Sequence, residues 1–273
     1  MKTLYVSDLD GTLITSRECI SDYSIKILND LLDKGIHFTY ATARSIQTAK
    51  NATKGLHTDF PVIVYNGALI VNPKSNQIYY SATFEQSVKD YIVFILTTLD
   101  IYPLAYSLQE GKEKLSWLKG KETPSMMRYF SRRVNDERLC PVQETSDLAK
   151  GDVLYFNCMG DPNKMFAAYR IFSRDSRLNC FIHQETYQTD YWLEIFCKKA
   201  TKEVAVKKLK EIYGFEKVVC FGDSINDIPM FNIADEKYAV KNADDALKKL
   251  STDTIGFCEE DGVAKWLAEH YTL

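Results

Sequence analysis

The sequence predicts an α/β fold, a doubly wound parallel-sheet core into which a smaller α+β domain is inserted. Strand-like and helix-like segments alternate over residues 3–71 and again over residues 190–250, and the order between them is different. Strand–helix–strand order implies right-handed crossovers and a parallel sheet. Two such portions can share one sheet, as in doubly wound folds. We therefore expect residues 1–81 and 189–273 to form the core domain and residues 82–188 the inserted domain.

In the first portion, short runs of β-forming residues alternate with apolar positions at helical spacing. The expected strands are 3–8, 36–42 and 61–71, and the expected helices are 21–34 and 45–55. Ser21 can cap the first helix, and Gly35 stands where a C-cap glycine belongs. Within the third strand, Asn66-Gly67 predicts a hairpin turn.

The last portion repeats this alternation of strands and helices, and the middle portion does not. In the last portion the expected strands are 190–197, 217–223 and 237–240, and the expected helices are 201–213, 227–233 and 243–250. In the middle portion we expect helices at 85–99, 124–134 and 162–174, strands at 152–160 and 178–184, and a hairpin over 103–118. Glu110-Gly111 predicts the tip of that hairpin.

Composition is that of a soluble globular protein, with 45% hydrophobic and 26% charged residues among 273. The net charge of −3 argues against a nucleic-acid partner. No apolar run is long enough for a signal peptide or a membrane span. The seven cysteines are scattered and form no CxxC pair, which favours reduced thiols in a cytoplasmic protein. The sequence leaves the oligomeric state open.

The stretch "VSDLDGTLI" places Asp8 and Asp10 directly after a predicted buried strand. Ligands of open α/β sheets bind at the carboxyl ends of the strands. Gly11 allows a sharp turn there, and Thr12 can fix the loop by hydrogen bonding. Two carboxylates so close together favour a hard divalent cation such as Mg²⁺, although solvated aspartates in a turn are the alternative.

A second acidic motif, "CFGDSINDIPMF", places Asp223 after another short apolar strand. Asn226 and Asp227 follow, and either could simply cap the next helix. Thr42 ends the second predicted strand and offers a hydroxyl and a backbone N–H. Lys202 lies in the first turn of a predicted helix, where positive charge and helix N-terminus together suit an anionic oxygen.

Taken in order, "DLDGT", "TAR", Lys202 and "GDSIND" resemble the motifs of the haloacid dehalogenase-like hydrolase superfamily. They are most similar to its Cof-type sugar-phosphatase branch, whose Rossmann-like core carries a cap domain inserted between the second and third motifs. The resemblance covers nearly the whole chain. The middle portion matches the family's cap domain in position and size, but much less in sequence.

This resemblance implies a phosphoric monoester hydrolase that acts on small phosphate esters, such as sugar phosphates, and uses Mg²⁺. Asp8 would attack phosphorus and form an aspartyl-phosphate. Asp10 would protonate the leaving oxygen and then deprotonate the hydrolytic water. Asp8, the backbone carbonyl of Asp10 and Asp223 would hold Mg²⁺, with Asn226 and Asp227 in support.

The resemblance also assigns a phosphate site, formed by Thr42, Ala43 and Lys202. Lys202 would in addition offset the charge on Asp8. The branch usually has glycine where this chain has Ala43, so a family glycine with positive φ would require the loop to shift here. Asn66-Gly67 matches a further family element beside the active site, with a plain hairpin turn as the alternative.

The inserted domain is expected to act as a cap that selects the leaving group. Candidate contacts there are Trp117, Arg128, Tyr129, Arg132 and Arg133, with a solvated helix face as the alternative. Two other functions remain open at this point. A phosphomutase would release isomerised sugar phosphate and no free phosphate. A catalytically inactive binding module would bind sugar phosphates without turnover.

Overall fold

The computed structural model describes residues 2–184 and 189–271, which fold into two compact units. Unit 1 contains the residues up to Ser81 and those from Ala200 onward, and unit 2 spans Ala82–Lys199. The chain therefore leaves unit 1 once and returns once.

The sheet of unit 1 is parallel and has five strands in the order β14-β13-β12-β1-β2. The strands are β1 (Thr3–Ser7), β2 (His37–Tyr40), β12 (Lys217–Gly222), β13 (Glu236–Val240) and β14 (Asp253–Ile255). β1 pairs with β2 on one side and with β12 on the other. The prediction that the two sequence portions share one doubly wound sheet is confirmed.

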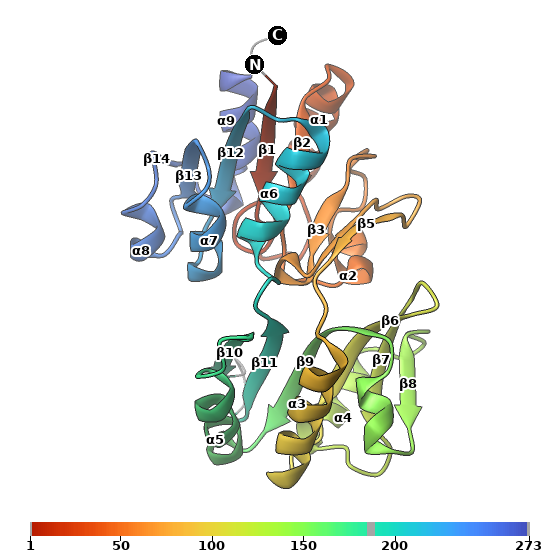
Figure 1. Ribbon diagram of the computed structural model, residues 1–273. Coiled ribbons are helices and arrows are strands. Elements are labelled where there is room, and N and C mark those ends of the chain that lie inside the picture. Colours follow the sequence, from red (N-terminus) through yellow and green to blue (C-terminus); the bar gives the residue numbers. More distant parts are fainter. Residues whose placement is uncertain (1, 185–188, 272–273) are drawn as a thin grey trace. The chain divides into compact units, whose positions relative to one another are not determined.

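Helices cover both faces of this sheet (Figure 1). The helices of unit 1 are α1 (Asp22–Asp33), α2 (Ile46–Ala52), α6 (Lys202–Tyr213), α7 (Ile228–Phe231), α8 (Asp245–Lys248) and α9 (Gly262–His270). α6 lies in front of the sheet in Figure 1, and α1 and α9 lie behind it. Ser21 caps α1 as predicted, because its side chain accepts the Ser24 N–H. Apolar side chains such as Leu4 and Val6 are fully buried between these layers.

The predicted strand 61–71 is two antiparallel strands rather than a third parallel strand of the main sheet. They are β3 (Val62–Val64) and β4 (Leu69–Val71), and β5 (Ile78–Ser81) extends them. The turn between them is the short 3-10 helix Tyr65–Gly67, in which all three residues have positive φ. One isolated bridge, Ala41 to Ile63, links this small sheet to the chain after β2.

Unit 2 is built on a second sheet in the order β10-β11-β9-β6-β7-β8. Its strands are β6 (Leu104–Gln109), β7 (Lys112–Leu118), β8 (Leu139–Val142), β9 (Asp152–Gly160), β10 (Leu178–Gln184) and β11 (Tyr191–Cys197). All neighbouring pairs are antiparallel except β7–β8. The predicted hairpin is β6–β7, and Glu110 and Gly111 at its tip both have positive φ.

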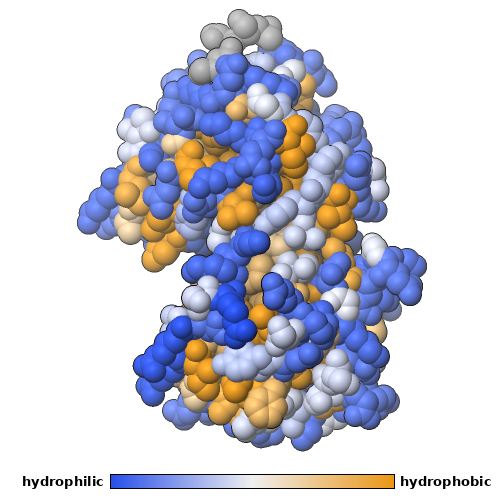
Figure 2. All heavy atoms as spheres, in the orientation of Figure 1, coloured by the Kyte–Doolittle hydropathy of each residue, from blue (hydrophilic) through white to orange (hydrophobic). Residues whose placement is uncertain are grey.

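The helices of unit 2 lie on both faces of this sheet. They are α3 (Gln86–Thr98), α4 (Pro124–Ser131) and α5 (Pro162–Phe172). α3 and α5 share one face, where Tyr91 contacts Phe172 and Phe166 contacts Tyr191. In Figure 1 both helices lie in front of the sheet, and Figure 2 shows apolar patches over them. The exposed apolar side chains of the two helices include Phe94 and Phe166.

The predicted boundary at residues 188/189 is wrong by one strand. The segment 190–197 was expected in the core domain, but β11 pairs with β9 and β10 in the sheet of unit 2. The return to unit 1 therefore follows Lys199. An apolar strand of this length suits either sheet, so the sequence pattern could not decide between them.

Two expectations about the chain as a whole concern cysteines and membranes. All seven cysteines are free thiols. Among residues 2–184 and 189–271, every helix is too short or too polar to cross a membrane.

Candidate active site

Three carboxylates meet at the carboxyl edge of the unit 1 sheet. β1 and β12 run in register, with Ser7 opposite Phe221, and the Asp8 N–H donates to the Phe221 carbonyl at 2.9 Å. Asp8 and Asp223 therefore emerge side by side, and Asp227 joins them from the turn that follows. Carboxylate oxygens of these three aspartates lie within 4.8 Å of one another. The convergence expected from the two acidic motifs is present.

Burial makes this cluster unfavourable for three negative charges. Asp8 is 4% exposed and Asp227 is fully buried. Burial raises the pKa of Asp8 well above its usual range, against the opposing effect of Lys202 and with added repulsion from Asp227. Burial also raises the pKa of Asp223 to about 6, with Asp227 again contributing. The cluster needs nearby positive charge to stay ionised at neutral pH.

Lys202 supplies part of that charge from the first turn of α6. Its Nζ lies 2.5 Å from Asp8 Oδ1 and 2.6 Å from Asp227 Oδ1, and the residue is only 2% exposed. Burial lowers the pKa of Lys202, but the two carboxylates more than offset this and raise it. Lys202 therefore remains a cation. One lysine against three carboxylates still leaves an excess of negative charge.

The remaining oxygens of the cluster fit a divalent cation. In the described part of the chain, hydrogen bonds take both oxygens of Asp227 but leave Asp8 Oδ2 and Asp223 Oδ2 without one. Carboxylate oxygens are the ligands that hard ions such as Mg²⁺ prefer. Asp8 and Asp223 are thus the candidate direct ligands, and Asp227 is a supporting residue.

Asp227 combines two roles that the sequence presented as alternatives. Its Oδ2 accepts the backbone N–H groups of Asp223 and Ser224, at 3.0 and 3.2 Å, and so caps the turn. Its Oδ1 accepts from Lys202. Asn226 has a more peripheral place, because its Oδ1 accepts the Ser224 hydroxyl at 2.6 Å. Asp227 therefore fixes both the Asp223 loop and the lysine.

Two glycines allow backbones to approach the cluster closely. Gly67 has φ +94°, and a Cβ at this position would overlap the Thr201 carbonyl, just before Lys202. Gly11 has φ +78°, and a Cβ there would overlap the Asp223 carboxylate. The Asn66-Gly67 element, expected either as a turn or as part of the site, is thus a turn that packs against the start of α6.

The segment after β2 reaches the same edge as Asp8, since the Ala41 N–H donates to the Ser7 carbonyl at 2.9 Å. Thr42 is buried, and its N–H donates to the Ile63 carbonyl at 3.0 Å. The backbone N–H of Thr42 is therefore committed, contrary to our expectation, and only its hydroxyl can donate. Ala43 is exposed, and φ is negative there, so alanine in place of glycine causes no backbone strain.

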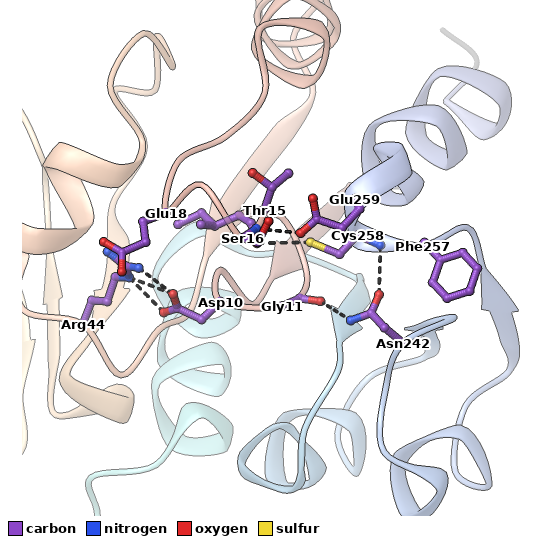
Figure 3. Close-up of a pocket in the computed structure, with 11 residues that line it drawn as sticks. Asp10, Gly11, Thr15, Ser16, Glu18, Arg44, Asn242, Phe257, Cys258 and Glu259 are labelled. Atoms are coloured by element: carbon purple, nitrogen blue, oxygen red, sulfur yellow. Dashed lines mark hydrogen bonds and ion pairs between the residues drawn. The ribbon is translucent and has the colours of Figure 1, made fainter. Parts of the chain in front are cut away.

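The side chain of Asp10 points toward Arg44 and pairs with it (Figure 3). Arg44 Nε donates to both Asp10 oxygens, at 3.0 and 2.9 Å, and Nη2 donates to Oδ1 at 2.6 Å. These hydrogen bonds raise the pKa of Arg44. The Arg44 backbone is itself anchored, because its N–H donates to Thr42 Oγ1 and its carbonyl accepts the Tyr65 N–H.

A cavity of about 420 Å³ lies beside this ion pair. Its lining comes from four separate loops, as Figure 3 shows, and consists of Asp10, Gly11, Ile14, Thr15, Ser16, Glu18, Arg44, Asn242, Phe257, Cys258 and Glu259. Asn242 ties two of these loops together, because it donates to the Gly11 carbonyl and accepts the Cys258 N–H. The loop that carries Asp10 is therefore fixed by Arg44 at the Asp10 side chain and by Asn242 at the Gly11 carbonyl.

Sequence reasoning missed two side chains of this site. Arg44 stands in the quoted "TAR" motif, and its charge so close to Thr42 was a usable signal. Thr12 was assigned only to loop geometry, yet its hydroxyl donates to Asp223 Oδ1 at 3.0 Å. Nothing in the sequence could pair positions 12 and 223.

The side chains singled out in the inserted domain have partners within unit 2. The Trp117 indole N–H and the Arg128 guanidinium each donate to an acidic side chain at 2.8 Å. The Arg133 guanidinium lies 3.4 Å from the centre of the Tyr129 ring. Arg132 ends α4 and is exposed. Most of the candidate side chains in the inserted domain therefore have partners within unit 2 and need no ligand to account for their positions.

Comparison with known protein families shows to which family the chain belongs. The model of the haloacid dehalogenase-like hydrolases matches residues 5–267, which is nearly the whole chain. The chain belongs to the haloacid dehalogenase-like hydrolases. Its motifs and its cap place it in the Cof-type branch of that superfamily, and it is a phosphatase.

Among characterised relatives, this hydrolase is similar to two proteins of Bacillus subtilis strain 168. Both are named 5-amino-6-(5-phospho-D-ribitylamino)uracil phosphatase. YitU is 24% identical over 99% of this chain and 98% of its own length, and YwtE is 27% identical over 95% of both. Full-length coverage shows that both domains are shared.

Solved structures share the fold of this hydrolase. The protein TM0651 of Thermotoga maritima superimposes with a TM-score of 0.82 at 23% identity, over 100% of this chain and 98% of its own. A sugar phosphatase of subclass IIB of the superfamily superimposes with a TM-score of 0.71 at 18% identity, over 98% of both chains.

Proposed function

We propose that this phosphatase hydrolyses small phosphomonoesters, such as sugar phosphates, with Mg²⁺ and through an aspartyl-phosphate on Asp8. The observation that carries the proposal is the position of Lys202, whose Nζ bridges Asp8 and Asp227 at 2.5 and 2.6 Å. A buried lysine on a buried carboxylate fixes a nucleophile and offsets its charge. The two free oxygens of Asp8 and Asp223 support a cation site beside it.

In the first step, a carboxylate oxygen of Asp8 attacks phosphorus, a phosphorus–oxygen bond forms, and the bond to the ester oxygen breaks. Bound Mg²⁺ would neutralise phosphoryl charge as it develops. The donors we assign to the phosphoryl oxygens are Lys202, the Thr42 hydroxyl and the backbone N–H of Ala43, an exposed residue. Preorganised donors of this kind stabilise the transition state more than the ground state.

Asp10 handles the protons in this proposal. It gives a proton to the leaving oxygen in the first step. In the second step it takes a proton from the water that attacks phosphorus, so that phosphate leaves and Asp8 is restored. Pairing with Arg44 fixes the direction of the Asp10 carboxylate. The first step requires a protonated Asp10 that has left Arg44.

Turnover of para-nitrophenyl phosphate in the presence of Mg²⁺ tests the assigned nucleophile. Asp8→Asn should abolish turnover, because an amide oxygen is a poor nucleophile. Asp33→Asn, at an exposed aspartate, is the matched control and should turn over normally. Equal rates from Asp8→Asn and the unaltered protein would rule out Asp8 as the nucleophile.

A panel of phosphate esters with free phosphate as the readout addresses the substrate. It should include hexose and pentose phosphates and the ribitylaminouracil ester named in YitU and YwtE. Free phosphate supports hydrolysis, whereas isomerised ester would indicate a mutase. We also place the protein in the cytoplasm, which the seven free cysteines support.

A further inference from the structure

One face of the unit 2 sheet carries polar side chains among aromatic rings. Asn157 of β9 and Glu194 of β11 are directly opposite each other, so their side chains share a face. Trp192 lies two residues before Glu194 and shares that face. Phe181 of β10 is opposite Glu194 on its other side. We call these four residues the cap-face patch.

Three polar groups of the cap-face patch lack partners within residues 2–184 and 189–271. Asn157 is 2% exposed, and its Oδ1 accepts no hydrogen bond. The indole N–H of Trp192 is buried and donates none. Glu194 has no charged or hydrogen-bonding neighbour there, and burial alone raises its pKa to about 7. The patch therefore presents two acceptors and one donor without bonds.

Leaving such groups unpaired is unfavourable. Each buried donor or acceptor without a partner destabilises the fold, and most buried polar groups in proteins are paired. Valine or leucine at these strand positions would avoid that cost. Two buried unpaired groups beside a carboxylate without a partner therefore indicate a bound partner from outside residues 2–184 and 189–271.

Aromatic rings surround the patch. Phe196 follows Glu194 on the same face and stacks on Tyr155, with ring centres 4.7 Å apart. Tyr129 of α4 meets Trp192 edge-on at 5.8 Å. Glu194 is a carboxylate without a positively charged partner in the described residues, so its surroundings favour a positively charged group over an anion.

We propose that the cap-face patch binds the protonated amino group of a small organic ligand. Glu194 and Asn157 Oδ1 accept its N–H groups, and the Trp192 indole N–H donates to an oxygen elsewhere on the ligand. An ammonium group offers three donors where a hydroxyl offers one, so it can satisfy both acceptors together. Glu194 and Trp192 are partly exposed, so a ligand approaches the patch at these two side chains.

This inference goes beyond the proposed function, because no residue of the acidic cluster takes part in it. The amine has two possible sources with the same chemistry. It is either the leaving group of the phosphate ester or a free amine that binds independently of turnover. The experiment below distinguishes the two.

Glucosamine is the probe, and glucose, which lacks the amine, is its control. Calorimetric titration of the full-length protein should give an affinity for glucosamine at least about tenfold above that for glucose, equivalent to about 1.4 kcal/mol. Glu194→Gln, which keeps the shape of the side chain, should remove this preference. Glu137→Gln, at an exposed glutamate of the same unit, should retain it. Thermal unfolding of each variant checks that it is folded.

Asp8→Asn protein should bind glucosamine as the unaltered protein does, so failure of the proposed chemistry leaves this test intact. Hydrolysis of glucosamine 6-phosphate and glucose 6-phosphate then separates the two sources. A kcat/KM preference for the amino ester that disappears in Glu194→Gln identifies the leaving group. Glucosamine binding without such a preference identifies an independent ligand. Equal affinity for glucosamine and glucose, or an unchanged preference in Glu194→Gln, overturns the proposal.

Discussion

Arg44 forms a bidentate ion pair with the Asp10 carboxylate, in which Nη2 lies 2.6 Å from Oδ1 and Nε lies 2.9 Å from Oδ2. This two-pronged geometry fixes direction as well as charge. Asp10 consequently points toward Arg44, while Asp8, two residues earlier, points into the acidic cluster. Two aspartates separated by one residue thus have different surroundings, as the proposed roles of nucleophile and proton carrier require.

Replacing Arg44 should therefore slow the hydrolysis of the phosphorylated enzyme. In Arg44→Met, Asp10 loses the cation that orients it, so we expect kcat to fall by about tenfold, which is less than the roughly 10²–10⁴-fold that a general acid or base contributes. A burst of para-nitrophenol in rapid mixing should appear, because the second step becomes limiting. Arg44→Lys keeps the charge and should recover part of the rate. An unchanged kcat without a burst would show that Arg44 plays no part.

Removing Lys202 should reduce both stability and activity. Lys202→Met leaves two buried carboxylates facing each other, and loss of one partner from a buried ion pair destabilises proteins by about 3–5 kcal/mol. Urea unfolding in the absence of metal measures this loss. Lys207→Met, on the exposed side of the same helix, removes only a surface pair with Glu203 and should change stability by less than about 1 kcal/mol. Similar losses in the two variants would contradict a central role for Lys202.

Much of the fold and the site followed from local sequence patterns. Asp8, Asp223 and Lys202 could be placed because each stands at the end of a strand or the start of a helix, and parallel strands bring such ends together. The pairing of Arg44 with Asp10 could not be predicted, because it depends on the direction of two side chains, which the spacing of residues in the sequence does not reveal. β11 was assigned to the wrong sheet for a related reason, since the apolar pattern of a strand does not show which strands it pairs with.

Gly67 offers a test of how backbone packing positions Lys202. Gly67→Ala places a Cβ against the Thr201 carbonyl and forces alanine into positive φ. We expect a loss of stability of about 2–3 kcal/mol and a fall in kcat, because the start of α6 must move. Gly35→Ala is the control, since φ there is +89° but its Cβ would meet open space. It should lose only about 1 kcal/mol and keep full activity. Full activity in Gly67→Ala would show that Lys202 does not depend on this contact.

The dependence of Mg²⁺ binding on pH should follow Asp223. Burial raises the pKa of this carboxyl to about 6, so the metal-free folded chain holds a proton there more tightly than the unfolded chain. As pH falls through 6, the proton stabilises the metal-free fold and competes with Mg²⁺ for the same oxygen. We expect the rise in Tm caused by Mg²⁺ to be full at pH 8, to shrink through that window and to vanish at about pH 5. Asp223→Asn should show only a small rise in Tm with Mg²⁺. A Mg²⁺-dependent rise in Tm that persists unchanged at pH 5 would exclude Asp223 as a ligand.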